Sequence, residues 1–280
     1  MEKAIKRYFP IFVLPTMIAF TLGFIIPFVE GVYLSFCKFT TVNDAKFIGF
    51  ANYAKVFADE TFVHAFWYTA AFTVVSVILI NVLAFAVALL LTKGFKGTNI
   101  FRTVFFMPNL IGGIVLGYIW QLLLNGILMK FSRTLTYSST YGFWGLIILM
   151  CWQQIGYMMI IYIAGIQNIP GELIEAAEID GATKWQILKK VTIPMVMPSI
   201  TVCTFLTLTN SFKLFDQNLA LTNGEPSKMS EMLALNIFNT FYGRTGYEGV
   251  GQAKAVIFFI LVTVIALTQN YLTRRKEGQQ

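Results

Sequence analysis

The sequence predicts an all-α membrane protein with six transmembrane helices. Its mean hydropathy is +0.67 and only 12% of its residues are charged, whereas about 25% of the residues of an ordinary globular chain are charged. Its apolar runs are long enough to cross roughly 30 Å of hydrocarbon as helices and too long for membrane strands. The formal charge of +7 is therefore no evidence for nucleic-acid binding.

Six charge-poor runs define the expected spans. The first follows a basic N-terminus but is too long for the core of a signal peptide, so we expect an uncleaved span. The fourth exceeds one span: its polar start, Thr134 to Tyr141, is expected outside the membrane, and the span covers Phe143 to about Gly165. The six runs are Tyr8–Val29, Ala65–Thr92, Thr103–Met129, Thr134–Gly171, Val191–Phe212 and Ala255–Thr273.

The distribution of Lys and Arg gives the orientation. Twelve of these residues lie in four short segments on one side, and nine lie in longer segments on the other side. The positive-inside rule then places both termini and a loop at about 169–192 in the cytoplasm. A loop at about 213–253 lies outside, and residues 1–280 form one transmembrane domain. The twelve are Lys3, Lys6, Arg7, Lys93, Lys96, Arg102, Lys184, Lys189, Lys190, Arg274, Arg275 and Lys276.

The stretch Glu175–Pro198 is the longest polar segment on the cytoplasmic side. It predicts two short helices joined by a turn. Pro170 stands near the first position of the first helix, where its missing N–H costs nothing. Gly181 is expected to end that helix with a positive φ. Thr183 and Gln186 predict a capping box for the second helix.

This stretch resembles the EAA loop of importer permeases of the ATP-binding-cassette (ABC) class. The shared pattern is Glu-Ala-Ala, two residues, Asp-Gly-Ala, then aromatic or apolar residues and prolines at fixed spacing. A match of this length is specific, whereas a bare Glu-Ala-Ala is not; the plainer alternative is an amphipathic helix pair between two spans. The matching residues are Glu175, Ala176, Ala177, Asp180, Gly181, Ala182, Trp185, Pro194 and Pro198, with Leu188 at an apolar position.

Two further segments resemble permeases of the maltose/multiple-sugar type, specifically the first of the two permeases. Phe47–Tyr53 resembles their F-x-G-x-x-N-Y signature on the outer side, although on its own an ordinary glycine turn explains it better. Phe101-Arg102-Thr103, followed by Pro108, resembles their F-R-T…P. Arg102 also suits a positive-inside anchor.

A third segment of this kind lies in the outer loop. Leu221–Pro226 resembles the L-T-G-G-G-P turn of these permeases, with Asn223 and Glu225 in place of glycines. Asn tolerates left-handed backbone geometry well and Glu less so, so the turn is expected to differ in detail. An amphipathic helix is expected to follow over Ser227–Thr240.

The resemblance implies a type I ABC importer permease fold: six helices with cytoplasmic EAA coupling helices, in a bacterial cell membrane. It implies four kinds of partner: a homologous second permease, two ATPase subunits that bind ATP and Mg, an extracytoplasmic solute-binding protein, and a saccharide. The chain has no G-x-x-x-x-G-K-[ST] motif, so we expect no nucleotide or other cofactor on it. Trp185 and Leu188 are expected to bind the second coupling helix back to the bundle.

Polar residues inside the spans are candidates for a solute path. Neutral amides suit a hydroxyl-rich solute, and the lack of carboxylates at mid-depth argues against a proton or cation relay. For any single residue, hydrogen bonding between helices is the favoured alternative. Gly113 and Gly117 form a G-x-x-x-G step for close packing, either inside the chain or at a subunit interface. The candidates are Gln121, Asn125, Gln153, Gln154 and Asn210.

Other functions fit less well. An importer for glycerol phosphate or a polyamine stays open, although a phosphate should require intramembrane cations and only Lys213 is available, at a span edge. A secondary transporter should show intramembrane charges or an inverted repeat and would leave the EAA loop unexplained. A membrane enzyme would need a catalytic cluster, which His64 and scattered carboxylates do not provide. Cys37, Cys151 and Cys203 show no ligand spacing, so neither a disulfide nor a metal site is predicted.

Overall fold

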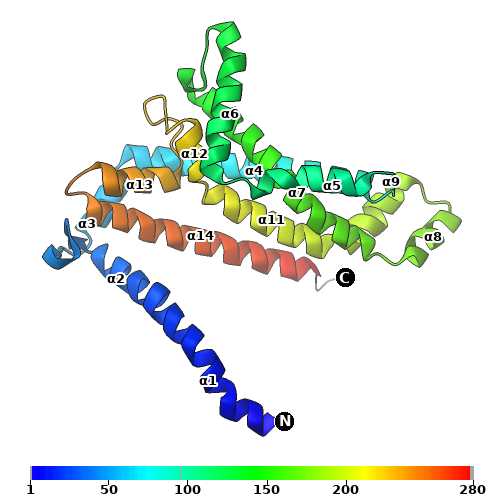
Figure 1. Cartoon of the computed structure of the whole chain (residues 1–280), viewed down its shortest axis with the longest axis horizontal. Helices are drawn as coiled ribbons and strands as arrows, with labels where there is room; N and C mark the ends of the chain where they lie inside the picture. The colour runs from blue at the N-terminus through cyan, green and yellow to red at the C-terminus, as the bar shows by residue number, and fades with distance from the viewer. Residues whose placement is uncertain (1, 95, 278–280) are drawn as a thin grey trace. The chain divides into compact units, whose positions relative to one another are not determined.

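The chain is mainly helical (Figure 1). It divides into two compact units. The computed structural model describes residues 2–94 and 96–277, without the side chains of residues 2–8, 10, 270 and 272–277. The side chains of six basic residues near the termini therefore lie outside the described ones, and the cytoplasmic position of the termini stays a prediction. So does the single domain expected for residues 1–280. The six are Lys3, Lys6, Arg7, Arg274, Arg275 and Lys276.

The first unit is Met1–Phe62 with Ile237–Ile260, and the second is Val63–Asn236 with Leu261–Gln280. The first contains α1 (Glu2–Phe20), α2 (Ile26–Leu34), a small antiparallel pair of β1 (Cys37–Lys38) and β2 (Lys46–Phe47), and α3 (Ala51–Phe57). Three helices have residues in both units: α4 (Glu60–Leu91), α13 (Leu233–Gly243) and α14 (Glu248–Glu277).

The second unit contains the remaining helices. They are α5 (Thr98–Phe106), α6 (Gly113–Leu128), α7 (Ser139–Gln167), α8 (Gly171–Ile179), α9 (Lys184–Ile187), α10 (Ile193–Met195), α11 (Met197–Phe212) and α12 (Asp216–Leu221).

The number of spans agrees with the prediction. In the described part of the chain, five helices are long and apolar enough to cross a membrane, and one bent helix pair makes a sixth when it counts as one span. The five are Ile11–Leu34, Glu60–Leu91, Gly113–Phe131, Ser139–Gln167 and Glu248–Gln269, and the pair is Lys184–Met195 with Met197–Phe212.

The third apolar run, Thr103–Met129, is not one continuous helix, and the candidate span in it begins only at Gly113. Helix α5 ends at Phe106, and the chain is extended at Ile111 before α6 begins. Pro108 lies in the short 3-10 turn between them, and its ring and missing N–H disfavour continuation of an α-helix. Figure 1 shows α6 running at a steep angle to α5 and α7.

The glycine step at the start of α6 packs against α12. A Cβ added at Gly113 would lie 2.8 Å from the Cβ of Asp216, and one added at Gly117 would lie 2.5 Å from the Cβ of Ala220. Real Cβ atoms do not approach this closely, so only glycine allows the two helices to be so near. Of the two explanations for the G-x-x-x-G step, packing inside the chain is confirmed.

The main apolar core lies in the second unit, where α4, α7 and α11 meet. Buried Phe72, Leu146 and Met158 belong to it. A polar tie crosses the same three helices: the Tyr162 hydroxyl donates to Asn81 Oδ1 at 2.7 Å, and Asn81 Nδ2 donates to Thr207 Oγ1 at 3.3 Å. Hydrogen bonds of this kind hold helices together in a membrane, where hydrophobic burial does not.

The Phe47–Tyr53 segment stabilises the fold of the first unit. Gly49 has a φ of +63°, as expected for a glycine turn. Buried Asn52 donates through Nδ2 to the carbonyl oxygens of Ser35 and Cys37, at 2.9 and 2.8 Å. The Tyr53 hydroxyl lies 2.7 Å from Ser35 Oγ. The segment therefore fixes the chain where α2 ends.

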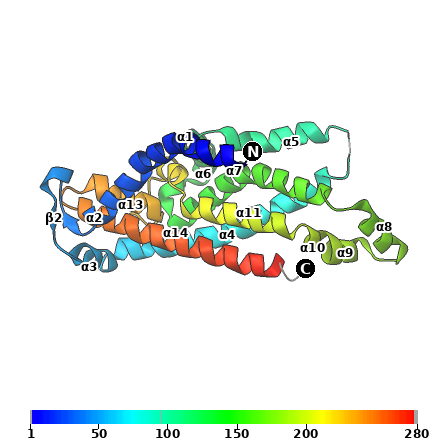
Figure 2. The ribbon, with the colours of Figure 1, turned by 90° about the horizontal axis from the view of Figure 1, so that it is seen from below.

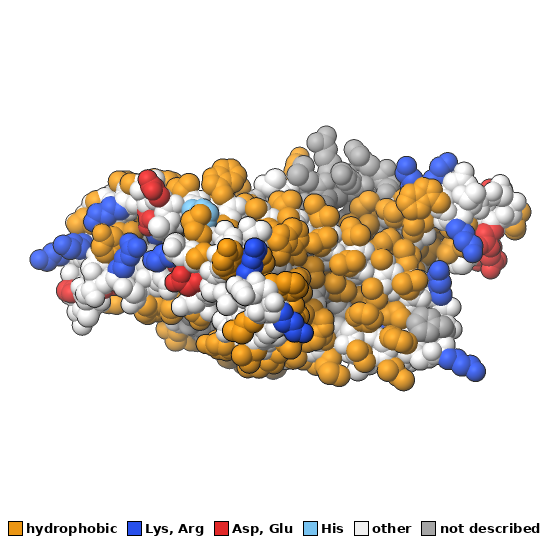
Figure 3. All heavy atoms as spheres, turned by 90° about the horizontal axis from the view of Figure 1, so that it is seen from above, with side chains coloured by type: hydrophobic (Ala, Val, Ile, Leu, Met, Phe, Trp, Pro, Cys, Tyr) orange, Lys and Arg blue, Asp and Glu red, His pale blue; other side chains and the backbone are white. Residues whose placement is uncertain are grey.

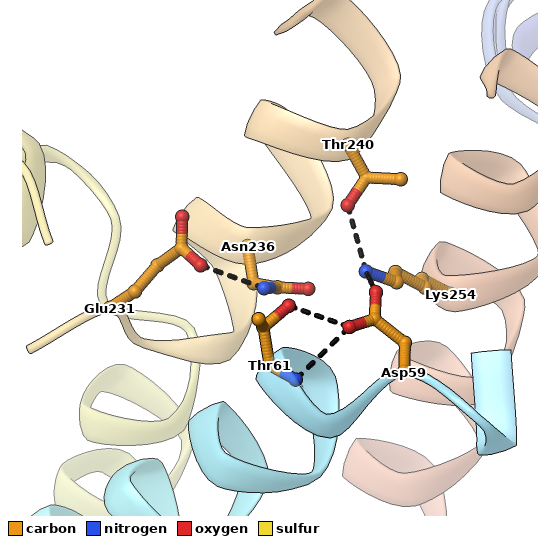
Figure 4. Close-up of polar contacts among 6 residues, drawn as sticks. All are labelled: Asp59, Thr61, Glu231, Asn236, Thr240 and Lys254. Atoms are coloured by element: carbon orange, nitrogen blue, oxygen red, sulfur yellow. Dashed lines mark hydrogen bonds and ion pairs between the residues drawn. The ribbon is translucent and has the colours of Figure 1, made fainter. Parts of the chain in front are cut away.

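A buried ion pair ties α4 to α14 within the first unit (Figure 4). Lys254 Nζ is fully buried and donates to Asp59 Oδ2 and to Thr240 Oγ1, each at 2.8 Å. Asp59 Oδ1 also accepts from the backbone N–H and hydroxyl of Thr61, at 3.0 and 2.7 Å, which is the pattern of a helix N-cap at the start of α4. The ring of Phe62 lies 5.2 Å from the ammonium.

The turn at Leu221–Pro226 forms, but the helix after it begins later than predicted. Asn223 and Gly224 have φ values of +50° and +80°, whereas Glu225 does not adopt a positive φ. The predicted helix over Ser227–Thr240 is wrong at its start, because Ser227 and the residue after it are also left-handed and α13 begins only at Leu233.

Candidate functional site: the α8–α9 pair and a polar cavity

Helix α8 ends in a hydrogen-bonded glycine turn. Gly181 has a φ of +76° and donates its N–H to Glu178 O at 3.0 Å. Ala182 N–H donates to Ala177 O at 2.9 Å. These two bonds form a Schellman motif, in which the left-handed residue lets the last carbonyls of the helix find partners. The predicted turn and the positive φ at Gly181 are confirmed.

Helix α9 begins with the predicted capping box. Thr183 N–H donates to Gln186 Oε1 at 2.7 Å, and Gln186 N–H donates to Thr183 Oγ1 at 3.4 Å. Beyond α9 the chain continues through a π-helical turn and α10, and it bends by 69° where α11 begins. Pro170 is the N-cap of α8 rather than its first residue, one position away from the prediction.

The α8–α9 pair is exposed at one end of the second unit, as both views of the ribbon show (Figures 1 and 2). Ile179 is 86% exposed and Trp185 is 68% exposed. The expectation that Trp185 binds α9 back to the bundle is therefore wrong; Ile187, which is 8% exposed, is the buried residue of α9, and Leu188 is half-buried. The buried face of a four-residue helix could not be fixed from periodicity.

Charge gathers at this end of the unit. In Figure 3, apolar side chains cover the middle of the face in view, while acidic and basic side chains lie at the end that carries α8 and α9. Residues Glu175, Ala176 and Asp180 of the predicted coupling set are exposed, and Ala177 and Ala182 are half-buried. The surface of α8 therefore presents small residues together with carboxylates.

Two of the five candidate path residues line one polar cavity of about 440 Å³. Gln154, on α7, is 8% exposed, and its Oε1 is shielded from solvent without a hydrogen-bond partner in the described part of the chain. Asn210, on α11, lies across the cavity. The lining residues are Met150, Gln154, Asn210, Lys213, Leu214, Phe215, Asp216 and Gln217.

Gln153 contributes to the polar cavity indirectly, through hydrogen bonds to other residues. Its Oε1 accepts a hydrogen bond of 2.8 Å from Gln217 Nε2, and its Nε2 donates to Ile111 O at 3.4 Å. Gln153 therefore positions Gln217, which lines the cavity. The sequence interpretation missed Gln217, because it assigned α12 to an extracytoplasmic loop; the signal that could have found it is the amide pair Gln217-Asn218 directly after a span.

The other two candidates make hydrogen bonds that hold the fold together. Gln121 Nε2 donates to Leu221 O, at the C-terminal end of α12, at 3.0 Å. Asn125 Oδ1 accepts from Leu135 N–H at 2.8 Å. Neither residue lines the polar cavity. For these two amides the structure favours the alternative of helix and loop hydrogen bonding over a place beside the solute.

A bundle of apolar spans with an exposed helix pair at one end defines a multispanning membrane protein. The chain belongs to the family described as binding-protein-dependent transport system inner membrane component, whose model matches residues 80–278. The resemblance to importer permeases is thereby confirmed, and the chain is a non-catalytic permease subunit.

Full-length relatives support this assignment. The chain is 42% identical over 276 residues to the probable starch degradation products transport system permease protein AmyD of Thermoanaerobacterium thermosulfurigenes, covering 95% of this chain and 94% of that protein. It is 28% identical to the multiple sugar-binding transport system permease protein MsmF of Streptococcus mutans, covering 99% of each.

A solved structure shares the fold. A chain of a bacterial ABC transporter involved in the import of the acidic polysaccharide alginate superposes with a TM-score of 0.82, at 23% identity and with 98% of each chain covered. The type I importer fold expected from the sequence is thus confirmed.

Proposed function

We propose that this chain forms half of the translocation path of an ATP-driven importer for a neutral saccharide. The observation that carries the proposal is its 42% identity, along nearly its whole length, to a permease named for the transport of starch degradation products. The cavity between Gln154 and Asn210 supports the same solute class. Amide groups both donate and accept hydrogen bonds, as a sugar hydroxyl requires.

The charges at the cavity do not favour glycerol phosphate or a polyamine. Lys213 and Asp216 both line it, so it presents one charge of each sign. A phosphate would be attracted by Lys213 but repelled by Asp216. A polycation would be attracted by Asp216 but repelled by Lys213. A neutral, hydroxyl-rich solute accepts hydrogen bonds from the ammonium and donates them to the carboxylate.

We propose further that α8 is the element through which ATP hydrolysis drives transport. The residues assigned to this coupling are Glu175, Ala176, Ala177, Asp180, Gly181, Ala182, Trp185 and Leu188. Two ATPase subunits hold ATP and Mg, and one of them would receive the exposed helix of this chain in a groove. The exposed Ile179 and Trp185 add apolar surface for this contact.

The end caps of the pair support movement of α8 and α9 as one rigid unit. The Schellman turn and the capping box satisfy the backbone groups at the junction of α8 and α9. Movement of α8 would therefore be carried through the bent pair into α11, which also supplies Asn210 to the cavity. A second permease completes the path, a solute-binding protein delivers the saccharide from outside, and both chain termini lie in the cytoplasm.

Uptake into proteoliposomes tests the proposal. The permease pair, its ATPase and its binding protein are reconstituted with ATP inside, and entry of a labelled malto-oligosaccharide is compared with entry of glycerol phosphate and spermidine. The proposal requires ATP-dependent uptake of the saccharide alone. Uptake without ATP, or preference for either charged solute, contradicts it.

A further inference from the structure

Two cavities adjoin each other where α4 ends and α5 begins. The first, of about 350 Å³, is polar and is lined by Thr98, Asn99 and Arg102, among others. The second, of about 480 Å³, is lined by five apolar residues and one lysine: Val87, Leu90, Leu91, Lys93, Phe101 and Phe105. Leu91 borders both cavities, so a polar compartment and an apolar compartment lie next to each other.

The polar cavity has an unused cationic donor. Arg102 Nη2 donates to Leu91 O at only 3.5 Å, and Arg102 Nε is shielded from solvent without a hydrogen-bond partner in the part of the chain that the structure describes. Lys93 borders the apolar cavity, and Lys96 lies in the same connection. An anion with several acceptor oxygens would complete the hydrogen bonding of the guanidinium.

No carboxylate lines either cavity. The sequence has no Asp or Glu between Glu60 and Glu172, so no carboxylate of α4, α5, α6 or α7 beyond Glu60 competes for Arg102. The nine-residue helix α5 also begins at the polar cavity, after Gly97, which has no side chain to cap it. The positive end of a helix dipole favours an anion.

The place of the cavities in the membrane decides which anion fits. The connection between α4 and α5 lies at the end of the second unit that carries α8 (Figure 2). Leu90 and Phe101, which border the apolar cavity, are 57% and 47% exposed, so the apolar cavity lies at the apolar surface of the chain. A soluble anion would leave this apolar cavity empty, whereas a phospholipid would fill both compartments.

We propose that the two cavities bind an anionic phospholipid of the leaflet on the α8 side. Its phosphate lies against Arg102 and the start of α5, and one acyl chain lies along Leu90, Leu91 and Phe105. Basic pockets between membrane helices bind anionic headgroups in this way. This site is independent of the solute cavity on α7, α11 and α12.

Native mass spectrometry of the chain purified with its partner subunits tests the proposal. The complex is titrated with phosphatidylglycerol, phosphatidylcholine and inorganic phosphate. The wild type should retain phosphatidylglycerol in preference to phosphatidylcholine. Arg102→Gln should weaken phosphatidylglycerol binding roughly fivefold, the effect of one cation near a headgroup. Arg102→Lys keeps the charge and should retain most of the binding.

Two further variants separate the two compartments from general charge effects. Leu90→Trp fills the apolar cavity without changing a charge and should also weaken phosphatidylglycerol binding. Arg133→Gln removes an exposed cation from the α6–α7 connection and should have no effect. Equal losses in Arg102→Gln and Arg133→Gln, normal binding in Leu90→Trp, or displacement of the lipid by inorganic phosphate would each overturn the proposal.

Discussion

Replacing Asp59 by asparagine should destabilise the protein because it leaves a buried ammonium without its carboxylate. Lys254 is fully buried, whereas the Asp59 side chain is 20% exposed. Removing one partner of a buried ion pair costs about 3–5 kcal/mol, and the partial exposure favours the lower end, about 3 kcal/mol. Each kcal/mol lowers the melting temperature of a chain of this size by about 2–4 °C, so we expect a fall of roughly 6–12 °C.

The reverse substitution should cost less. Lys254→Met keeps an unbranched apolar side chain at this buried position and leaves the 20% exposed Asp59 able to reach water, so we expect a loss of about 1 kcal/mol. The double variant Asp59→Asn/Lys254→Met should be about as stable as Lys254→Met alone, because no buried charge is left. Thermal unfolding of the purified complex measures all three.

A control variant separates the loss of the ion pair from the general effect of replacing an aspartate that accepts backbone hydrogen bonds. Asp44 accepts hydrogen bonds from the backbone N–H groups of Thr40 and Thr41 and is exposed. The amide oxygen of Asn accepts the same backbone hydrogen bonds, so Asp44→Asn should leave the melting temperature almost unchanged. A double variant that is as unstable as the two single losses added together, or an Asp59→Asn variant that melts with the wild type, would refute the reasoning.

The same ion pair predicts a dependence on pH. Burial would raise the pKa of Asp59, but the hydrogen bond and charge of Lys254 and the hydrogen bonds from Thr61 lower it from 3.8 to about 2. Its contribution to stability is therefore complete above about pH 4 and is lost as the pH falls towards 2. The difference in melting temperature between wild type and Lys254→Met should be constant from pH 5 to 7 and should shrink below pH 4; an unchanged difference at pH 3 would be inconsistent with the pairing.

Two more predictions concern packing and the solute path. Gly156→Ala should prevent correct folding, because its Cβ would overlap the backbone carbonyl of Phe105, whereas Gly126→Ala, with nothing within 4 Å, should behave like the wild type in size-exclusion chromatography. Gln154→Leu should lower saccharide uptake at normal expression, whereas Gln121→Leu should lower expression and thermal stability instead, by about 1 kcal/mol for the lost hydrogen bond. Normal uptake in Gln154→Leu would remove the cavity from the path.

Features set by a few neighbouring residues could be predicted from the sequence. The turn at Gly181 and the box formed by Thr183 and Gln186 depend on contacts within six residues, so the residue types are enough to specify them. The apolar runs likewise predict where helices must cross a membrane. Whether Pro108 would break a helix was not predictable, because a membrane bundle can satisfy the backbone around a proline through residues distant in sequence.

Features set by distant contacts could not be predicted. Gln121 bonds to Leu221, 100 residues away, and Lys254 pairs with Asp59, 195 residues away. From the sequence alone, an amide side chain that contacts the solute cannot be distinguished from one that forms a hydrogen bond between two helices. Lys254 is one of the nine basic residues that the sequence placed in the outer segments, and its full burial in α14 depends on its distant partner Asp59.

The coupling role of the α8–α9 turn is tested most directly by solute-stimulated ATP hydrolysis in variants at Glu175 and Gly181. Gly181 has a φ of +76° and open space around its missing Cβ, so Gly181→Val acts through the backbone, at a cost of about 1 kcal/mol or more, while Gly181→Asn tolerates that geometry. We expect Glu175→Ala and Gly181→Val to lose ATPase co-purification and stimulation with normal membrane insertion, and Gly181→Asn to keep both. If Glu175 acts only through the helix dipole, Glu175→Ala should cost about 0.3–1 kcal/mol and leave transport nearly normal. Wild-type coupling in both Glu175→Ala and Gly181→Val would contradict the assignment of this turn as the transmission element.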